Sequence, residues 1–126
     1  MSKGTFVQIP KFTIGRQGHF VTDSEAIYDS EKFGRIVVPP NFETDFASIP
    51  NWVPRWLFDP MRHARYSAVF HDYLCRTAES YKERVMADHV FLEAMGVEGV
   101  KRWRRASMFS AVRANTYRMR LMRKWK

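Results

Sequence analysis

The chain has 126 residues, of which 45% are hydrophobic and 15% aromatic, and this composition is typical of one folded domain. No apolar run approaches the roughly 20 residues that a membrane-spanning helix requires, and residues 1–10 lack the apolar region of a secretory signal. The formal net charge of +8 indicates a partner of opposite charge. We therefore expect a protein of the cytoplasm, or of a particle assembled there, with no membrane span.

The positive charge is concentrated at the end of the chain. Residues 101–126 contain ten Lys or Arg and no Asp or Glu, whereas residues 1–100 contain eleven basic and thirteen acidic residues, a net charge of −2. A nearly neutral segment followed by a strongly basic one indicates that the C-terminal segment meets a polyanion or an acidic protein surface.

The first third of the chain has the pattern of short strands. Phe12 and Ile14 alternate with polar residues, residues 22–24 suit a turn, and the β-branched run 35–38 ends at Pro39-Pro40. Several short strands separated by turns predict a small antiparallel sheet or hairpins over residues 1–42.

Residues 43–60 form a connector rich in proline and aromatic residues. Pro54 and Pro60 exclude a long helix there. Two interpretations of the connector remain. It is either a lid, in which Trp52 and Trp56 fold over the core, or a packed loop, and we favour the packed loop.

From residue 61 onward the hydrophobic period is helical. We expect one helix over about residues 61–78, a second over about 82–95 that stops at Gly96, and a third from about residue 98 to near the end. The fold class is therefore α+β, with a small N-terminal antiparallel β-sheet or hairpins followed by a three-helix C-terminal half. One compact domain covers 1–126, with segments 1–42, 43–60 and 61–126.

The third helix combines an apolar stripe with basic residues. Trp103, Tyr117 and Leu121 recur on the stripe, and the chain has no acid after residue 100. A face that is merely solvated normally mixes both signs, so a partner-binding surface is favoured over a solvated face. The candidate partner-binding residues are Arg104, Arg105, Arg113, Arg118, Arg120, Arg123 and Lys124.

Polar residues on the apolar helix faces mark a candidate site. His71 lies in the stripe of the first helix with Asp72 as its neighbour, and Asp88 lies in the stripe of the second. A carboxylate on a core face is costly unless it is paired, hydrogen-bonded or bound to a metal. Asp45, which lies just before the aromatic part of the connector, is able to approach the same place. The surrounding polar network that we expect consists of Thr44, Ser48 and Arg84.

This cluster has two interpretations. In the first, Asp45, His71, Asp72 and Asp88 hold a divalent metal or act as general acid and base in a small hydrolase. In the second, they form a buried network that fixes the register between elements. The second is favoured, because the sequence contains no recognised metal motif and no glycine-rich phosphate loop. Cys75, the only cysteine, is interpreted as a core residue, and a nucleophilic pair with His71 is not expected.

Four motifs in order resemble a known family. They are the run VPPNFETDFASIP at residues 38–50, HDYL at 71–74, RVMADHVF at 84–91 and AVR at 111–113. This series resembles the phage and prophage family catalogued as domain of unknown function 1353, over about residues 12–114. The chain departs from the family pattern at Asn41, where glycine is frequent, and at Cys75, where an aromatic residue is frequent. The resemblance implies that one site contains Thr44, Asp45, Ser48, His71, Asp72, Arg84 and Asp88.

The resemblance implies a phage-borne protein, located in the virion or the host cytoplasm. Three functions are consistent with such a protein. The favoured one is a virion-associated structural or assembly component at a neck, tail or fibre attachment, which docks onto acidic surfaces of other virion proteins and forms a homo-oligomeric ring. The alternatives are the small hydrolase and an early protein that binds a host factor or nucleic acid. An enzyme needs its cluster open to substrate, whereas a structural network is closed and fully paired.

Overall fold

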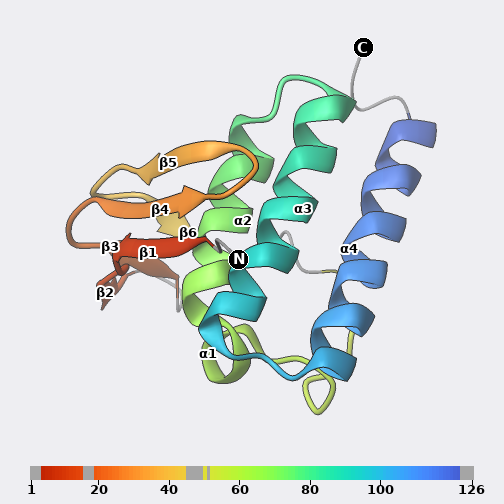
Figure 1. The fold of residues 1–126 in the computed structure, drawn as a ribbon, viewed down its shortest axis with the longest axis horizontal. Coiled ribbons are helices and arrows are strands. Elements are labelled where there is room, and N and C mark those ends of the chain that lie inside the picture. The colour runs from red at the N-terminus through yellow and green to blue at the C-terminus, as the bar shows by residue number, and fades with distance from the viewer. Residues whose placement is uncertain (1–3, 16–18, 45–49, 51, 123–126) are drawn as a thin grey trace.

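The protein has the α+β architecture that the sequence predicts (Figure 1). The computed structural model describes residues 4–15, 19–44, 50 and 52–122. Strands occupy the N-terminal third of this part of the chain, and helices occupy the remainder. None of the helices described is long and apolar enough to cross a membrane.

The strands form two antiparallel sheets of three strands each. The first sheet has the order β1-β4-β5 and the second has the order β2-β3-β6. The bounds are β1 Thr5–Gln8, β2 Phe12–Ile14, β3 Phe20–Thr22, β4 Ala26–Ser30, β5 Gly34–Val38 and β6 Glu43–Thr44.

Alternating side chains determine which face of the first sheet is buried. Ala26 and Tyr28 on β4 are buried opposite Val38 and Ile36 on β5, their partners in register. The hairpin between these strands begins its return at Gly34, whose φ of +83° favours glycine. Strand β5 ends before the Pro39-Pro40 pair, as the sequence predicts, but β6 lies within the expected connector and pairs with β3.

The three expected helices are present, with changed ends. The helices are α1 Pro60–His63, α2 Arg65–Thr77, α3 Tyr81–Glu98 and α4 Arg102–Leu121. The prediction of one continuous helix over residues 61–78 was wrong, because the chain leaves helical geometry at Ala64, where φ is −158°. This break separates the single turn of α1 from α2.

Helix α3 shows why local signals place one helix end better than the other. Its N-cap is Ser80, whose hydroxyl accepts a hydrogen bond from the Glu83 backbone N–H at 3.1 Å. The predicted stop at Gly96 was wrong, since the helix continues through that residue to Glu98. It ends at Gly99, which takes the left-handed conformation with φ of +91°.

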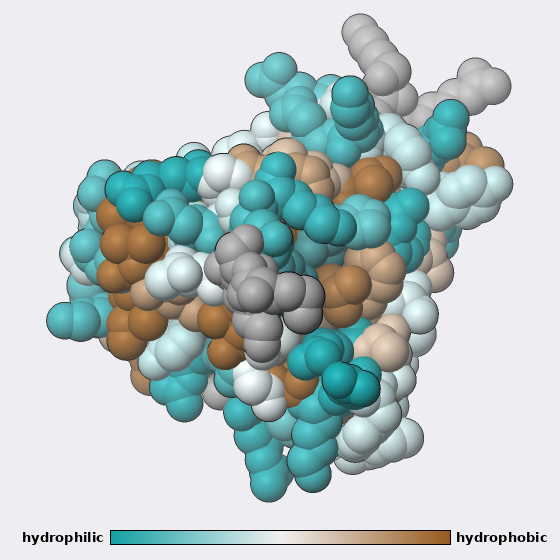
Figure 2. Space-filling model, viewed as in Figure 1, coloured by the Kyte–Doolittle hydropathy of each residue, from teal (hydrophilic) through white to brown (hydrophobic). Residues whose placement is uncertain are grey.

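The helices stack in order away from the strands. In Figure 1, α2 lies beside the sheets, α3 packs against α2, and α4 covers the far side of α3. The core joins Tyr28 and Val38 of the first sheet with Phe70 of α2, Phe91 of α3 and Met108 of α4. In the space-filling view, hydrophobic residues also gather on the surface over the strands, at the left of the molecule (Figure 2).

Helix α4 turns its predicted apolar stripe toward solvent. Trp103, Tyr117 and Leu121 are exposed, and they lie on one side of the helix because they are spaced by multiples of its period. The buried face, which contacts α3, consists of Met108, Ala111, Val112 and Thr116. The periodic pattern therefore predicted the helix, while the packing selected a different face.

Candidate functional site

A closed polar network joins α2, α3 and α4 at the centre of the helical half. His71 Nε2 lies 2.8 Å from Asp88 Oδ1, and the side chains of both residues are 0% exposed. The other carboxylate oxygen, Asp88 Oδ2, accepts hydrogen bonds from Thr116 Oγ1 at 2.6 Å and from Arg113 Nη1 at 3.3 Å. Asp88 thus has three partners, which offset the cost of burying its charge.

Cys75 is a buried core residue, as the sequence predicts, and it also belongs to the same network. Its Sγ lies 3.4 Å from His71 Nε2, one helical turn away on α2. The same ring nitrogen faces Asp88, so the three groups do not form a relay in which one imidazole nitrogen meets the acid and the other meets the nucleophile. Both Cys75 and His71 are buried, which removes the thiol from any substrate in solution.

The surroundings of His71 favour its charged form. Burial by itself lowers the pKa of His71, but the electrostatic interaction with the Cys75 sulfur and the hydrogen bond and charge of Asp88 outweigh burial and raise this pKa to about 9. The ring also stacks on Phe91, with the ring centroids 4.5 Å apart and the planes at 23°. Stacking and hydrogen bonding together hold the imidazole in one orientation.

Asp72 belongs to a second cluster, on the side of α2 that faces the strands. The Thr44 hydroxyl donates to Asp72 Oδ2, and Arg76 Nη2 lies 3.3 Å from the same oxygen. Arg76 also donates to the Glu43 carbonyl at 2.6 Å, which ties α2 to β6. Neighbouring residues of a helix point about 100° apart, so His71 and Asp72 face different elements.

The structure therefore divides the residues that the sequence grouped as one site. His71 and Asp88 meet between α2 and α3, whereas Thr44 and Asp72 meet between β6 and α2. Arg84 is buried on α3. The expected members Asp45 and Ser48 lie outside the described residues.

Sequence reasoning missed two members of the central network, Cys75 and Thr116. The spacing of Cys75 from His71 was a usable signal, because residues four apart on a helix share a face. Thr116 carried no such signal, since only the packing of α4 on α3 brings its hydroxyl to Asp88.

The connector does not form a tryptophan lid over this network. Trp52 and Trp56 are 61% and 74% exposed, whereas Phe58 at the end of the connector is buried in the core. The connector is joined to α4 instead, because Arg104 Nε donates to the Leu57 carbonyl at 2.8 Å.

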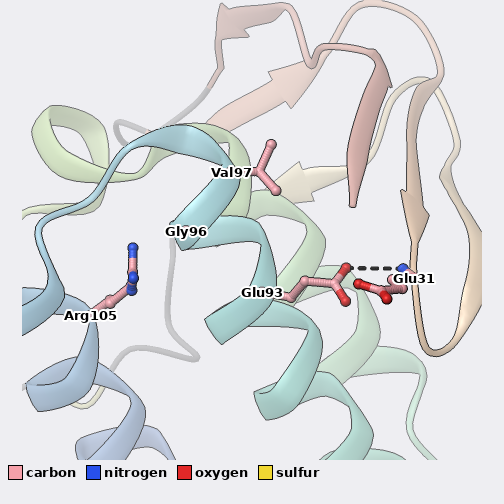
Figure 3. Close-up of a pocket in the computed structure, with 5 residues that line it drawn as sticks. All are labelled: Glu31, Glu93, Gly96, Val97 and Arg105. Carbon is pink, nitrogen blue, oxygen red and sulfur yellow. Dashed lines mark hydrogen bonds between the residues drawn. The ribbon is translucent and has the colours of Figure 1, made fainter. Parts of the chain in front are cut away.

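A separate hollow of about 200 Å³ opens between the end of α3 and the turn after β4 (Figure 3). Glu31 and Glu93 lie side by side on one wall, and Arg105 of α4 stands on the other side. Glu93 Oε1 accepts from the Tyr28 hydroxyl at 2.5 Å and from the Glu31 N–H at 3.3 Å, while Arg105 donates to the Val100 carbonyl at 3.0 Å. The Glu93 carboxylate and the Arg105 guanidinium are thus already engaged in contacts within the fold.

The pKa of the Tyr28 hydroxyl, which donates to Glu93, is raised by its surroundings. Burial raises the pKa of Tyr28, and the hydrogen bond and charge of Glu93 raise it further. Tyr28 therefore stays protonated and acts as a hydrogen-bond donor in the core.

The basic residues of α4 divide into inward and outward groups. Arg104 and Arg105 donate to backbone carbonyls, and Arg113 donates to Asp88, so these three side chains serve contacts within the protein. Arg118 and Arg120 are exposed near the C-terminal end of the helix, where the Arg120 guanidinium also stacks on the Tyr81 ring of α3, 4.5 Å from its centroid. Arg123 and Lys124 lie outside the described residues.

Residues 20–112 match the family described as protein of unknown function DUF1353. The chain belongs to this family. The match spans β3 to the middle of α4, and it includes the cluster of Thr44 and Asp72 together with His71, Cys75 and Asp88 of the central network. Arg113 and Thr116, which contact Asp88, lie beyond its end. No curated protein and no solved structure matches the chain.

Proposed function

We propose that this DUF1353 protein is a small structural or assembly component of a phage particle, which docks onto an acidic surface of a larger virion protein through α4. The observation that carries the proposal is the outer face of α4. This face consists of an exposed stripe, flanked by exposed arginines. The stripe is Trp103, Ser110, Ala114, Tyr117 and Leu121, and the flanking residues are Arg102, Arg118 and Arg120.

The chemistry of this face is that of a protein-binding surface. Trp103, Tyr117 and Leu121 are 51%, 52% and 65% exposed, an unusual position for three large apolar side chains on one helix. Tryptophan, tyrosine and arginine are the residue types that most often dominate the binding energy of interfaces. The small residues Ser110 and Ala114 between them leave room for a partner helix to approach closely.

The charge of α4 favours an acidic partner over a second copy of the same face. The segment 101–126 contains no Asp or Glu, so two α4 faces brought together would place like charges opposite one another. A partner that carries carboxylates around an apolar centre would complement the stripe and the flanking arginines.

The inward arginines favour a protein partner over nucleic acid. Arg104, Arg105 and Arg113 already donate hydrogen bonds within the chain, which leaves fewer free cations for phosphates. The centre of the outer face is apolar instead of basic.

The closed His71–Asp88 network supports an architectural role over hydrolysis. Both side chains are fully buried, and a catalytic acid or base must reach its substrate within hydrogen-bonding distance. The network instead connects three helices, one of which presents the outer face.

The proposal is tested by quantitative mass spectrometry of purified particles of the phage that encodes the chain. We expect the wild-type protein at a fixed copy number, and an incorporation about tenfold lower for the double variant Arg118→Glu/Arg120→Glu, equivalent to about 1.4 kcal/mol. The matched control is Lys11→Glu/Lys32→Glu, which makes the same change of charge at two exposed lysines of the strand region.

Two results would refute the proposal. One is the absence of the wild-type protein from purified particles, which would move the function to a host factor or to nucleic acid. The other is equal incorporation of both double variants, which would remove α4 as the docking element. Trp103→Ala checks the apolar part of the face and should also reduce incorporation.

A further inference from the structure

We propose that His71, Cys75 and Asp88 form a binding site for one zinc ion, which braces α2 against α3. His71 and Cys75 are four residues apart on α2 and therefore share a face, while Asp88 reaches them from α3. One ligand atom from each residue lies within 4.8 Å of the other two, and all three residues are buried. The inference does not depend on the docking function of α4.

The distances fit the size of a zinc site. Zinc binds thiolate sulfur at about 2.3 Å and histidine nitrogen or carboxylate oxygen at about 2.0–2.2 Å, so the ligand atoms of a tetrahedral site lie about 3.3–3.7 Å apart. The separation of 3.4 Å between Cys75 Sγ and His71 Nε2 is within this range. The 2.8 Å between His71 Nε2 and Asp88 Oδ1 must lengthen by about half an ångström to admit the ion.

The groups behind the ligands hold them in place, as in established metal sites. Thr116 and Arg113 bind Asp88 Oδ2 and leave Oδ1 directed at His71. The His71 ring is fixed by its stack on Phe91. The atoms that would bind the ion are thus pre-oriented by separate contacts from α3 and α4.

The charges of the three ligands balance a divalent cation. The Cys75 thiolate and the Asp88 carboxylate carry two negative charges, the imidazole is neutral when it binds a metal, and the sum with Zn²⁺ is zero. Binding releases to solvent the protons that the imidazole and the thiol carry in the metal-free protein. A neutral centre suits a site from which water is largely excluded. Zn²⁺ binds thiolate and imidazole ligands well, whereas the harder ions Mg²⁺ and Ca²⁺ prefer oxygen ligands.

The ligand set leaves at most one coordination position for a water molecule, and the burial of the residues keeps substrates away. The site is therefore structural, and its effect is to join the two central helices. It differs from the metal site considered from the sequence, because Cys75 replaces Asp45 and Asp72 as a ligand.

Cobalt titration of the untagged chain tests the site, because Co²⁺ bound to a thiolate absorbs in the near ultraviolet. After chelator treatment, Co²⁺ is added to the folded protein and also during refolding, since the ligands are buried. We expect one equivalent to bind with a thiolate charge-transfer band, and one equivalent of Zn²⁺ to abolish the band. Cys75 is the only cysteine, so the band can arise from no other residue.

Three variants separate the site from surface binding. Zn²⁺ affinity is measured in competition with a chromophoric chelator, and Cys75→Ser should weaken binding at least about tenfold. Thr116→Val removes only the hydroxyl that orients Asp88, and it should weaken binding about 10- to 100-fold. His19→Asn, which removes a half-buried imidazole in the strand region, should leave binding unchanged. Circular dichroism checks that each variant is folded.

The wild-type measurement decides the question even where a variant fails to fold. The proposal is overturned if wild-type protein shows no thiolate band with Co²⁺ under either condition. It is also overturned if folded Cys75→Ser binds Zn²⁺ as tightly as the wild type.

Discussion

The substitution Asp88→Ala tests whether the central network stabilises the fold. Asp88 is fully buried and contacts His71 at 2.8 Å, Thr116 at 2.6 Å and Arg113 at 3.3 Å. Removing one partner of a buried charge pair costs about 3–5 kcal/mol, because the remaining groups stay in a poorly solvating environment. A typical domain has a free energy of unfolding of about 5–15 kcal/mol. Asp88→Ala should therefore remove a large share of the stability.

Urea unfolding, followed by circular dichroism, measures this loss from the shift of the midpoint. A chelator is present, so that the experiment reports the hydrogen-bonded network alone. The control Asp29→Ala removes an exposed carboxylate, whose pair with Arg35 lies at the surface, and should change stability far less. If Asp88→Ala costs less than about 1 kcal/mol, the network does not stabilise the fold and the reasoning fails.

Two further predictions concern other contacts. Glu98 accepts hydrogen bonds from the backbone N–H groups of Tyr66 at 3.2 Å and Ser67 at 2.9 Å, at the start of α2. Glu98→Ala should therefore lower the free energy of unfolding by about 1–2 kcal/mol. An unchanged urea midpoint would contradict this role. The hydrogen bond from Arg35, together with its charge, lowers the pKa of Asp29, so their pair stabilises the protein above the unfolded-state pKa and loses its effect as the pH falls through the folded-state pKa. Arg35→Gln should raise the pKa of Asp29 toward its ordinary value in an NMR titration, and an unmoved titration midpoint would exclude this pairing in solution.

Much of the fold followed from local patterns. The antiparallel strands within residues 1–42 and the three main helices were predicted from periodicity and from proline and glycine positions, and these predictions are confirmed. One error concerned which of two nearby glycines ends α3. Gly96 does not end α3, because Gly99 three residues later satisfies the terminal carbonyls of Met95 and Gly96 in a left-handed cap.

The candidate site was predicted in part. The sequence singled out His71 and Asp88 because polar residues on apolar faces require partners, and the structure pairs them. Asp72, their predicted companion, turns to Thr44 instead. No local pattern assigns adjacent helical residues to different neighbours, because that choice depends on where β6 and α3 pack against α2.

The sequence by itself determined the strands and helices, the concentration of basic residues after position 100 and the presence of charged residues in the core. These properties depend on side-chain type and spacing along a short stretch of chain. Only the tertiary structure decided that α4 buries Met108 and Val112 and exposes Trp103 and Tyr117, and that Glu98 caps α2 from the far end of α3. Such contacts join residues far apart in the sequence, and their energy depends on the packing of whole elements, which no local window of residues contains.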